Sequence, residues 1–350
     1  MNKERIAVVF GTFAPLHQGH IDLIQRAKRQ CDRVRVVVSG YRGDRGEEVG
    51  LTLQKRFRYI REAFSNDELT QVYKLDETEL PRYPLGWEPW LQTALETIQY
   101  QTEAEELIFY VGEQAYKEEL EARGFEVHLQ DRCFGISATM IRENPSKYWE
   151  YLPREVREHL IPIITICGGE SSGKSIMIDK LANVFNTSSA WEYGREYVFE
   201  KLGGDEDSLQ YSDYEKIVFG HQSNVLYAAR NANKFALIDT DYITTLAFCL
   251  TYEKRDNPII REFVRNYKFD LTILLENNVK WVNDGLRSIG ETDRREKFQK
   301  LLKELYKEYN IPYIIVKSSD YEQRYLACQE IIKGYLAGKD NLQEIADSFI

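Results

Sequence analysis

Two glycine-rich turns in this chain have the residue types of phosphate-binding sites. The first, Gly11–His20, reads GTFAPLHQGH and follows an apolar run. The second, Gly168–Ser175, reads GGESSGKS and also follows an apolar run. A turn between a strand and a helix presents backbone N–H groups at the positive end of the helix dipole, where phosphate groups bind. The two turns therefore predict two nucleotide sites, and their different residues predict different reactions.

His17 and His20 give the first turn its chemistry. They are three residues apart in the first turn of an expected helix, so their imidazoles should lie close together beside the positive helix end. That arrangement suits a polyphosphate whose α-phosphorus is attacked by a second substrate. A histidine that only caps or packs the helix is the alternative interpretation.

The segment GISATMIR, residues 135–142, is predicted to complete this first site. Ser137 and Thr139 offer hydroxyl groups at a helix start, and Arg142 adds a cation one turn later. Taken alone, the segment is equally compatible with a simple helix cap. The residues assigned to the first nucleotide site, apart from the two histidines, are Gly11, Thr12, Phe13, Ser137, Thr139 and Arg142.

The second turn matches the P-loop pattern G-x-x-x-x-G-K-S in full. Lys174 is expected to reach the β- and γ-phosphates of ATP, and the Ser175 hydroxyl to bind Mg²⁺. Asp239 follows another apolar run directly, so we expect it, rather than Asp241, to be the second metal ligand. Two ordinary loop acids are the alternative. The residues assigned to this site are Gly168, Gly169, Glu170, Ser171, Ser172, Gly173, Lys174, Ser175 and Asp239.

Two segments that mix aromatic and charged residues are candidates for substrate contacts in the same half. The segment WEYGREY, residues 191–197, could stack a base on Trp191 or Tyr193 and supply Glu196 to accept a hydroxyl proton. The segment WVNDGLR, residues 281–287, is similar to a lid that carries Arg287 to the transferred phosphate. Surface aromatics over a core are the alternative for both segments.

The elements that position these residues alternate between strand and helix along the chain. Such alternation indicates mostly parallel sheets with helices on both faces, which bind ligands at the carboxyl ends of their strands. We therefore predict an α/β fold with two open parallel-sheet domains. The expected strands are 6–10, 34–39, 71–75, 107–111, 127–129, 163–167, 235–238, 270–275 and 313–316, and the expected helices are 21–30, 54–64, 87–100, 175–185, 216–231 and 294–309.

Prolines mark the expected junction between the two domains. Pro145, Pro153 and Pro162 punctuate one stretch, and proline stops helices and stiffens linkers. We place the first domain at residues 1–155 and the second at residues 161–350. Within the first domain, the glycine-rich and charged stretch 40–50 is expected to be a mobile loop, whose Arg42 and Arg45 are either phosphate ligands or solvated charges.

Composition narrows the class of protein. The formal net charge is −10 and no run of Lys or Arg forms a basic patch, so we expect no nucleic-acid partner. No apolar stretch reaches the roughly 18 residues that span a membrane, and the first expected strand begins too early for a signal peptide. The five cysteines are far apart and indicate buried thiols in a reducing compartment. We expect a soluble cytoplasmic protein, and its oligomeric state stays open, with a homo-oligomer as one alternative.

The first turn and the ISATMIR segment together resemble the nucleotidyltransferase superfamily, whose signatures are a (T/H)xGH turn and an ISxTxxR segment. With GGESSGKS, WEYGREYVFE, IDTD and LLENNVKWVNDGLRS added, nearly the whole chain resembles the NadR-type bifunctional proteins of NAD synthesis. The resemblance implies a Rossmann-like nucleotidyltransferase domain followed by a P-loop kinase domain. It also implies that His17, His20 and Arg142 bind the triphosphate of ATP and stabilise charge on its α-phosphate.

The reactions and their ligands follow from the same resemblance. The second domain would phosphorylate nicotinamide riboside with ATP, and the first would adenylylate nicotinamide mononucleotide with ATP, giving NAD and pyrophosphate. The cationic nicotinamide ring would stack on aromatic faces, for which Trp87, Tyr193 and Trp281 are candidates. Enterobacterial relatives carry a helix-turn-helix repressor segment. We expect none here because the first strand begins near residue 6.

Two other functions stay open on the sequence. The same reaction types could act on another vitamin-derived metabolite, as in a flavin-type kinase and adenylyltransferase pair, although flavin kinases use a fold other than the P-loop one. Alternatively, the P-loop domain could sense ATP or NAD and regulate the other half. A panel of ribosides would distinguish the metabolites, and loss of phosphorylation in Lys174→Ala would distinguish the enzyme from the sensor.

Overall fold

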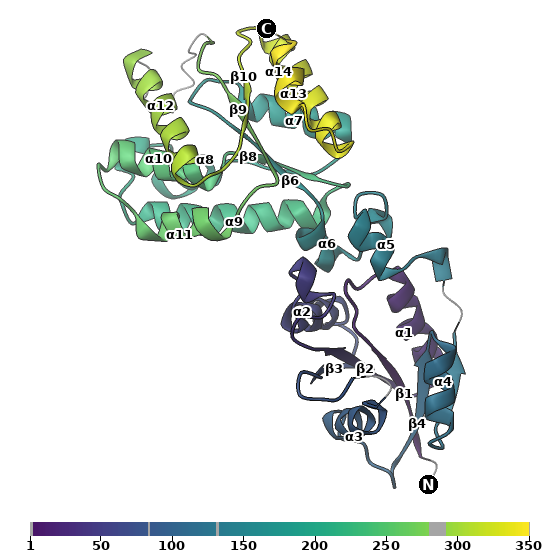
Figure 1. The fold of residues 1–350 in the computed structure, drawn as a ribbon. Coiled ribbons are helices and arrows are strands. Elements are labelled where there is room, and N and C mark those ends of the chain that lie inside the picture. Colours follow the sequence, from purple (N-terminus) through teal and green to yellow (C-terminus); the bar gives the residue numbers. More distant parts are fainter. Residues whose placement is uncertain (1–2, 83–84, 131–132, 280–291, 350) are drawn as a thin grey trace. The chain divides into compact units, whose positions relative to one another are not determined.

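The computed structural model describes residues 3–82, 85–130, 133–279 and 292–349, and the chain divides into two compact units, Met1–Leu160 and Ile161–Ile350. Each unit is an open sheet of parallel strands with helices on both faces (Figure 1). The α/β fold with two parallel sheets, predicted from the alternation of strand and helix patterns, is confirmed. No helix in the described parts of the chain is long and apolar enough to cross a membrane.

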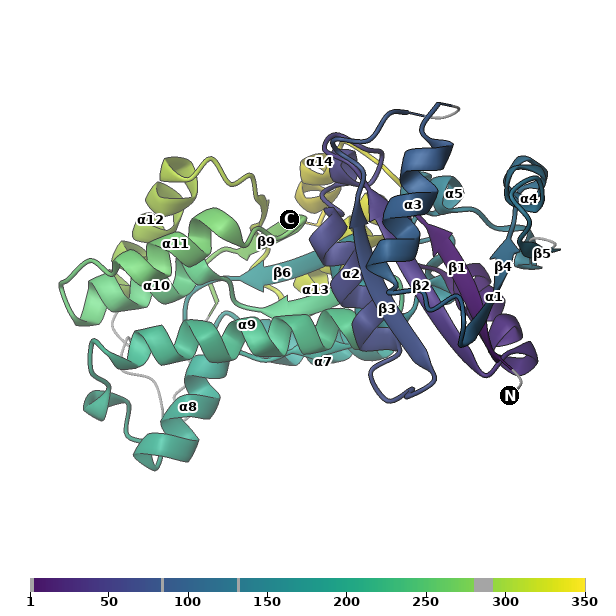
Figure 2. The same cartoon turned by 90° about the horizontal axis from the view of Figure 1, so that it is seen from below.

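The first unit has the strand order β3-β2-β1-β4-β5, with the first three strands side by side in Figure 2. Successive residues of the central strand β1 enter opposite cores, as expected for a strand covered on both faces. Ala7 and Val9 pack beneath α1 and α2, whereas Ile6 and Val8 pack beneath α3 and α4. The strands are β1 (Glu4–Gly11), β2 (Arg33–Gly40), β3 (Thr70–Asp76), β4 (Glu105–Val111) and β5 (Glu126–Leu129), and the helices are α1 (Gln18–Gln30), α2 (Leu53–Ala63), α3 (Trp87–Thr97), α4 (Gln114–Glu121), α5 (Ala138–Glu143) and α6 (Arg154–Leu160).

The second unit has the strand order β10-β9-β6-β8-β7. Helices α7, α13 and α14 lie on one face of the sheet, and α9 to α12 lie on the other (Figure 1). Their apolar side chains form a core on each face. Its strands are β6 (Ile163–Cys167), β7 (Ser189–Ala190), β8 (Ala236–Asp239), β9 (Leu271–Leu275) and β10 (Ile314–Val316), and its helices are α7 (Lys174–Phe185), α8 (Tyr193–Leu202), α9 (Asp213–Asn231), α10 (Tyr242–Tyr252), α11 (Pro258–Asn266), α12 (Thr292–Glu308), α13 (Tyr321–Leu336) and α14 (Leu342–Asp347).

Both glycine-rich turns leave the carboxyl end of the central strand of a sheet. β1 lies between β2 and β4, and β6 lies between β9 and β8, so the strand order reverses beside each of them. Open α/β sheets bind ligands at such reversal points. The fold therefore directs attention to these two strand ends.

Candidate nucleotide-binding sites

The histidine pair of the first turn is stacked. His17 is the N-cap of α1, and its Nδ1 accepts a hydrogen bond from the Gly19 amide at 3.1 Å. The rings of His17 and His20 lie 3.7 Å apart between centroids with an angle of 23° between their planes. Phe13 meets the His20 ring edge-on at 4.9 Å. The two imidazoles are therefore held together at the helix start, as their spacing predicted.

Two arginines from distant segments converge on the same turn. The Arg142 guanidinium donates from Nη1 to the Ala14 carbonyl at 2.5 Å and from Nη2 to Thr139 Oγ1 at 3.1 Å. The Arg45 guanidinium donates to Thr12 Oγ1 at 3.2 Å. Because neither arginine is near the turn in sequence, the fold creates this cationic cluster from three separate segments.

His17, His20 and Arg45 line a pocket of about 340 Å³, called here the N-terminal pocket, together with Thr139, the side-chain partner of Arg142. Burial lowers the pKa of His20 well below its ordinary value, and the nearby His17 and Arg45 lower it further. Burial also lowers the pKa of Arg142, with Arg45 adding to the effect. The pocket is thus a site where bound negative charge would be stabilised. Its lining includes Gly11, Thr12, Phe13, His17, His20, Arg45, Ser137 and Thr139.

The stretch 40–50, which the sequence predicted to be a mobile loop, is anchored in the structure. Asp44 is 2% exposed and pairs with the buried Arg56 on α2 at 2.6 Å. A glycine-rich and charged composition could not reveal this ion pair, because its partner lies in the following helix. The anchored backbone places the exposed side chain of Arg45 at the pocket, where it contacts Thr12.

The P-loop Gly168–Ser175 joins β6 to α7, and Gly173 caps the helix with a positive φ of 88°. A side chain there would be strained and would also come within 2.7 Å of the Tyr321 ring. Lys174 begins α7 and donates to the Gly169 carbonyl at 3.4 Å. The loop therefore has the geometry of a phosphate cradle with its lysine curled over it.

Asp239, at the carboxyl end of β8, accepts a hydrogen bond from Ser175 Oγ at 2.5 Å. Burial raises the pKa of Asp239, the charge on Lys174 opposes this shift, and Glu192 reinforces it. Asp241 has a structural role instead. It caps α10 by accepting from the Thr244 amide at 2.8 Å and also accepts from Tyr306. The choice of Asp239 over Asp241 therefore agrees with the geometry.

A second buried arginine braces the P-loop from behind. Arg324 on α13 is 0% exposed and donates to the Ser172 carbonyl at 3.0 Å and to the Glu276 carbonyl at 2.6 Å. It also donates to the Ser318 carbonyl and to Asn278 Oδ1. One side chain thus ties the P-loop to the ends of β9 and β10.

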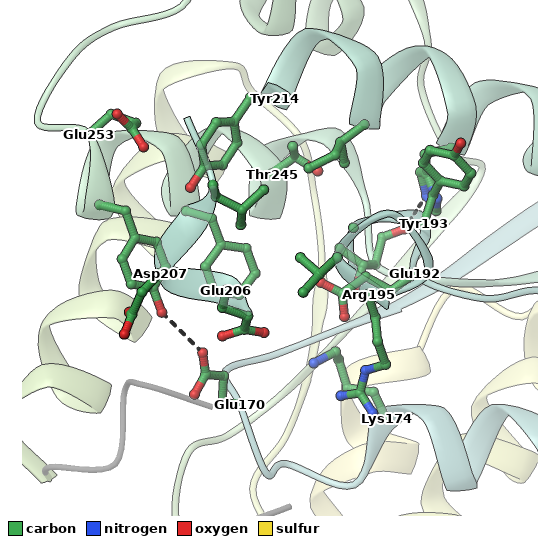
Figure 3. A pocket seen from close by; sticks show the side chains of 18 residues that line it. Glu170, Lys174, Glu192, Tyr193, Arg195, Glu206, Asp207, Tyr214, Thr245 and Glu253 are labelled. Carbon is green, nitrogen blue, oxygen red and sulfur yellow. Dashed lines mark hydrogen bonds between the residues drawn. The ribbon is translucent and has the colours of Figure 1, made fainter. Parts of the chain in front are cut away.

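A pocket of about 250 Å³, called here the C-terminal pocket, opens beside the P-loop (Figure 3). Lys174 and Arg195 lie on one side of it, while Glu206, Asp207 and Glu253 lie on the other. Tyr214, Phe248 and Tyr252 add aromatic walls, and Glu170 of the P-loop accepts a hydrogen bond from Tyr252 at 3.3 Å. The pocket therefore has its two cationic side chains near the P-loop and is acidic and aromatic at its other end.

Segment 191–197 contributes to this pocket through residues other than those expected. Glu196 is exposed, lies on the side of α8 toward α9, and accepts from Asn224 at 3.4 Å, whereas Glu192 lines the pocket. Trp191 is 59% exposed and donates to Asp179 on α7, so it does not line the pocket. Tyr193 does line it. The structure therefore places Glu196 and Trp191 outside the described lining of the pocket, because α8 begins at Tyr193 and turns Glu196 outward. Their assigned roles stay predictions.

Trp87, the candidate for ring stacking in the first unit, packs in a core of the structure. It is 7% exposed and belongs to the core between α3, α4 and the sheet, where its ring meets Phe10, Trp90 and Tyr116 edge-on. Phe10 and Tyr116, rather than Trp87, line the N-terminal pocket. The predicted contacts of Trp281 and Arg287 lie outside the described residues.

Known proteins with similar sequences divide in the same way. A family model described as cytidylyltransferase-like matches residues 8–144, and one described as an AAA domain matches residues 163–324. Two relatives are each named trifunctional NAD biosynthesis/regulator protein NadR. The Salmonella typhimurium protein is 46% identical over 343 residues, and the Escherichia coli K12 protein is 44% identical over 342. Each alignment covers 95% of this chain and 83% of the relative.

The chain belongs to the NadR family.

Solved NadR structures are similar along the same length. A NadR protein in complex with NR is 31% identical and has a TM-score of 0.83 over 95% of this chain and 96% of that one. A NadR protein in complex with NAD and AMP-PNP has the same identity and a TM-score of 0.81. The two-domain prediction of a NadR-type protein, made from motifs, is thereby confirmed.

Some site residues of this NadR-family chain were missed from its sequence. Glu192 lies in a segment that the sequence did single out. The sequence did not show where α8 begins, and therefore which carboxylate of the segment faces the pocket. Arg56 and Arg324 gave no signal, because an isolated arginine on a helix is ordinarily a surface residue. Burial against carbonyl groups distinguishes them, and burial of that kind is visible only in the fold.

Proposed function

We propose that this NadR-family chain makes NAD in two steps. The second unit phosphorylates nicotinamide riboside with ATP, and the first unit adenylylates the resulting mononucleotide with ATP, releasing pyrophosphate. The observation that carries the proposal is the pair of unlike phosphate sites, an imidazole and arginine cluster in one unit and a P-loop with Asp239 in the other. Membership in a family whose relatives are named for NAD biosynthesis favours nicotinamide compounds over flavins.

In the first unit, the N-terminal pocket supplies positive charge without a nucleophile of its own. A phosphate oxygen of the mononucleotide attacks the α-phosphorus of ATP, the bond from that phosphorus to the β-phosphate oxygen breaks, and pyrophosphate leaves. His17, His20, Arg45 and Arg142 stabilise the charge that accumulates on these oxygens. No covalent enzyme intermediate is needed, so catalysis consists of positioning and electrostatic stabilisation.

In the second unit, the C-terminal pocket holds the riboside with its hydroxyl toward the P-loop. Lys174 stabilises the transferred phosphate. Glu192 lines the pocket, and its charge acts on Asp239 at the P-loop end, so its carboxylate is placed to accept the proton of the hydroxyl group. The acidic and aromatic end suits a cationic pyridinium ring. The proposal thus places the proton acceptor at Glu192, whereas the sequence alone favours Glu196 of the same segment.

Mg²⁺ fits the residues present. Ser175 and Asp239 are oxygen donors in contact with each other, and Mg²⁺ in kinases is held by one or two such groups together with phosphates. No group of three or more His, Cys, Asp or Glu side chains in the described part of the chain could hold a metal ion by itself, so the nucleotide would complete the site. When bound, Mg²⁺ supplies charge neutralisation for the phosphates of ATP.

Two variants test the proposal. Lys174→Ala should abolish phosphorylation of nicotinamide riboside while NAD formation from the mononucleotide persists. His20→Ala should lower adenylyl transfer by about 10²–10³-fold and leave riboside phosphorylation intact. If either variant loses both activities while thermal unfolding shows both units folded, the division of the reactions between the two units is wrong. A cytoplasmic location and any homo-oligomer remain predictions.

A further inference from the structure

Arg56 is a buried arginine that lies behind the N-terminal pocket and does not line it. It is 1% exposed and donates from Nη2 to Asp44 at 2.6 Å. Its Nη1 donates to the Thr12 carbonyl at 2.9 Å and to the Ser39 carbonyl at 3.4 Å. A single guanidinium therefore joins the first glycine-rich turn, the end of β2 and the loop 40–50. Burying an ion pair costs desolvation free energy, so the pair is weak evidence for a gain in stability. Its contacts instead define the geometry of the three segments.

The loop is built around this ion pair. Asp44 Oδ1 accepts from the Gly46 amide at 2.9 Å and from the Glu47 amide at 3.0 Å. Burial would raise the pKa of Asp44, but these amides and Arg56 hold it below its ordinary value, so the carboxylate is charged at neutral pH. A Cβ at Gly40 would stand 2.5 Å from both members of the pair. The backbone thus packs directly against the two charges.

Arg45 follows Asp44 in the chain and is the loop residue that lines the pocket. Its guanidinium donates to the side chain of Thr12, whose carbonyl accepts from Arg56. Arg45 also acts electrostatically on His20 and Arg142. Arg56 therefore contacts the chain on both sides of the Arg45–Thr12 hydrogen bond: Asp44, which precedes Arg45, and the Thr12 carbonyl.

We infer that Arg56 is a positioning residue for adenylyl transfer: it holds the Arg45 guanidinium and the Thr12 turn at the distance at which both meet the triphosphate. The inference rests on the proposed function of the first unit. Arg56 makes no contact with substrate in this arrangement. It acts through Arg45, and a lysine could not replace it, because three acceptors in different directions require the planar fork of a guanidinium.

The test compares Arg56→Lys with a matched control in the full chain. Arg35 and Glu105 form a similar buried ion pair in the same sheet, with contacts of 2.6 and 2.8 Å, and neither is among the described residues that line the N-terminal pocket. Arg56→Lys, Arg35→Lys, Arg45→Ala and the double variant Arg45→Ala/Arg56→Lys are assayed for NAD formation from the mononucleotide. Thermal unfolding and riboside phosphorylation report on folding.

Arg56→Lys and Arg45→Ala should each lower kcat/KM for ATP by about 10- to 100-fold, while Arg35→Lys changes it by no more than about twofold. The kcat/KM of the double variant should equal that of the less active single variant, because the two residues act as one unit. An Arg56→Lys enzyme as active as Arg35→Lys, or losses that multiply in the double variant, would overturn the inference. If Arg56→Lys does not fold, Asp44→Asn takes its place under the same criteria. A wild-type chain that forms no NAD from the mononucleotide would instead contradict the proposed function.

Discussion

The Ser175 hydroxyl donates a 2.5 Å hydrogen bond to the Asp239 carboxylate, across 64 residues of chain. The contact joins the first turn of α7 to the end of β8, so the P-loop and the neighbouring strand present their oxygen atoms at one point. The charge on Lys174 reaches the same carboxylate. Three groups that would handle a γ-phosphate and its Mg²⁺ under the proposed function thus lie together.

Asp239→Asn should lower riboside phosphorylation by about 10²–10³-fold, because it removes a negative oxygen from the expected Mg²⁺ site while keeping the shape of the side chain. Adenylyl transfer from the mononucleotide should not change. The control is Asp241→Asn, which weakens the cap of α10. It should lower the thermal unfolding temperature and lower the phosphorylation rate much less than Asp239→Asn does. Equal phosphorylation rates in the two variants would show that Asp239 has no special role.

Glu192 and Glu196 provide a matched pair one helical turn apart. Glu192→Gln should lower kcat for riboside phosphorylation by about 10²–10⁴-fold, since a positioned general base contributes that much. Glu196→Gln should stay within about twofold of wild type, because Glu196 is exposed outside the C-terminal pocket. Measured kcat values for the two variants decide the assignment, and the reverse order would restore Glu196 as the base.

The acidic end of the C-terminal pocket should select a cationic ring. Asp207→Asn and Glu253→Gln each remove one negative charge from that end. Each should raise KM for nicotinamide riboside by about fivefold, corresponding to about 1 kcal/mol of screened attraction. The KM for reduced nicotinamide riboside, which is neutral, should change little. Equal increases in KM for both ribosides would mean that the carboxylates affect the shape of the pocket and do not select a cationic ring.

His20 should titrate below its ordinary range. Burial and two nearby positive groups lower its pKa in the folded chain, so the unfolded chain binds more protons just below pH 6.5. Stability from this residue is therefore complete above about pH 6.5 and decreases as the pH falls toward the folded pKa, with a slope of at most about 1.4 kcal/mol per pH unit. NMR of ring-labelled histidine, with His20→Asn for assignment, should give a midpoint below 6.5 that rises when ATP binds. A midpoint at or above 6.5 without ATP would contradict the structure of the site.

The fold was predictable where pattern and burial agree. β1, β2 and β6 are apolar runs covered on both faces, and α1 and α2 have one apolar stripe each, so their periods identify them. α10 was missed because its sequence, YITTLAFCLTY, is buried nearly all round and has no helical stripe to detect. The two-residue strand β7 exists through its pairing with β8 and carries no pattern of its own.

The site was predictable where chemistry is local in sequence. His17, His20, Lys174 and Ser175 belong to motifs whose spacing sets their geometry. Asp239 was predictable because it ends an apolar strand. Trp87 packs in a core and Trp191 is exposed, which the sequence could not show because an aromatic residue occurs equally in a core, on a surface or against a ligand. Arg45 could be proposed as a candidate, but the ion pair that holds its loop depends on a contact that no spacing rule describes.

The most direct measurement of the proposed two-step reaction is a time course with the full chain, nicotinamide riboside, ATP and Mg²⁺, sampled for the mononucleotide, NAD, ADP and pyrophosphate. We expect the mononucleotide and ADP to form first and NAD and pyrophosphate to follow, with one ADP and one pyrophosphate for each NAD. Lys174→Ala should form none of these from the riboside, yet form NAD and pyrophosphate from the mononucleotide. A wild-type chain that yields no NAD from the riboside, or NAD without prior ADP, would contradict it.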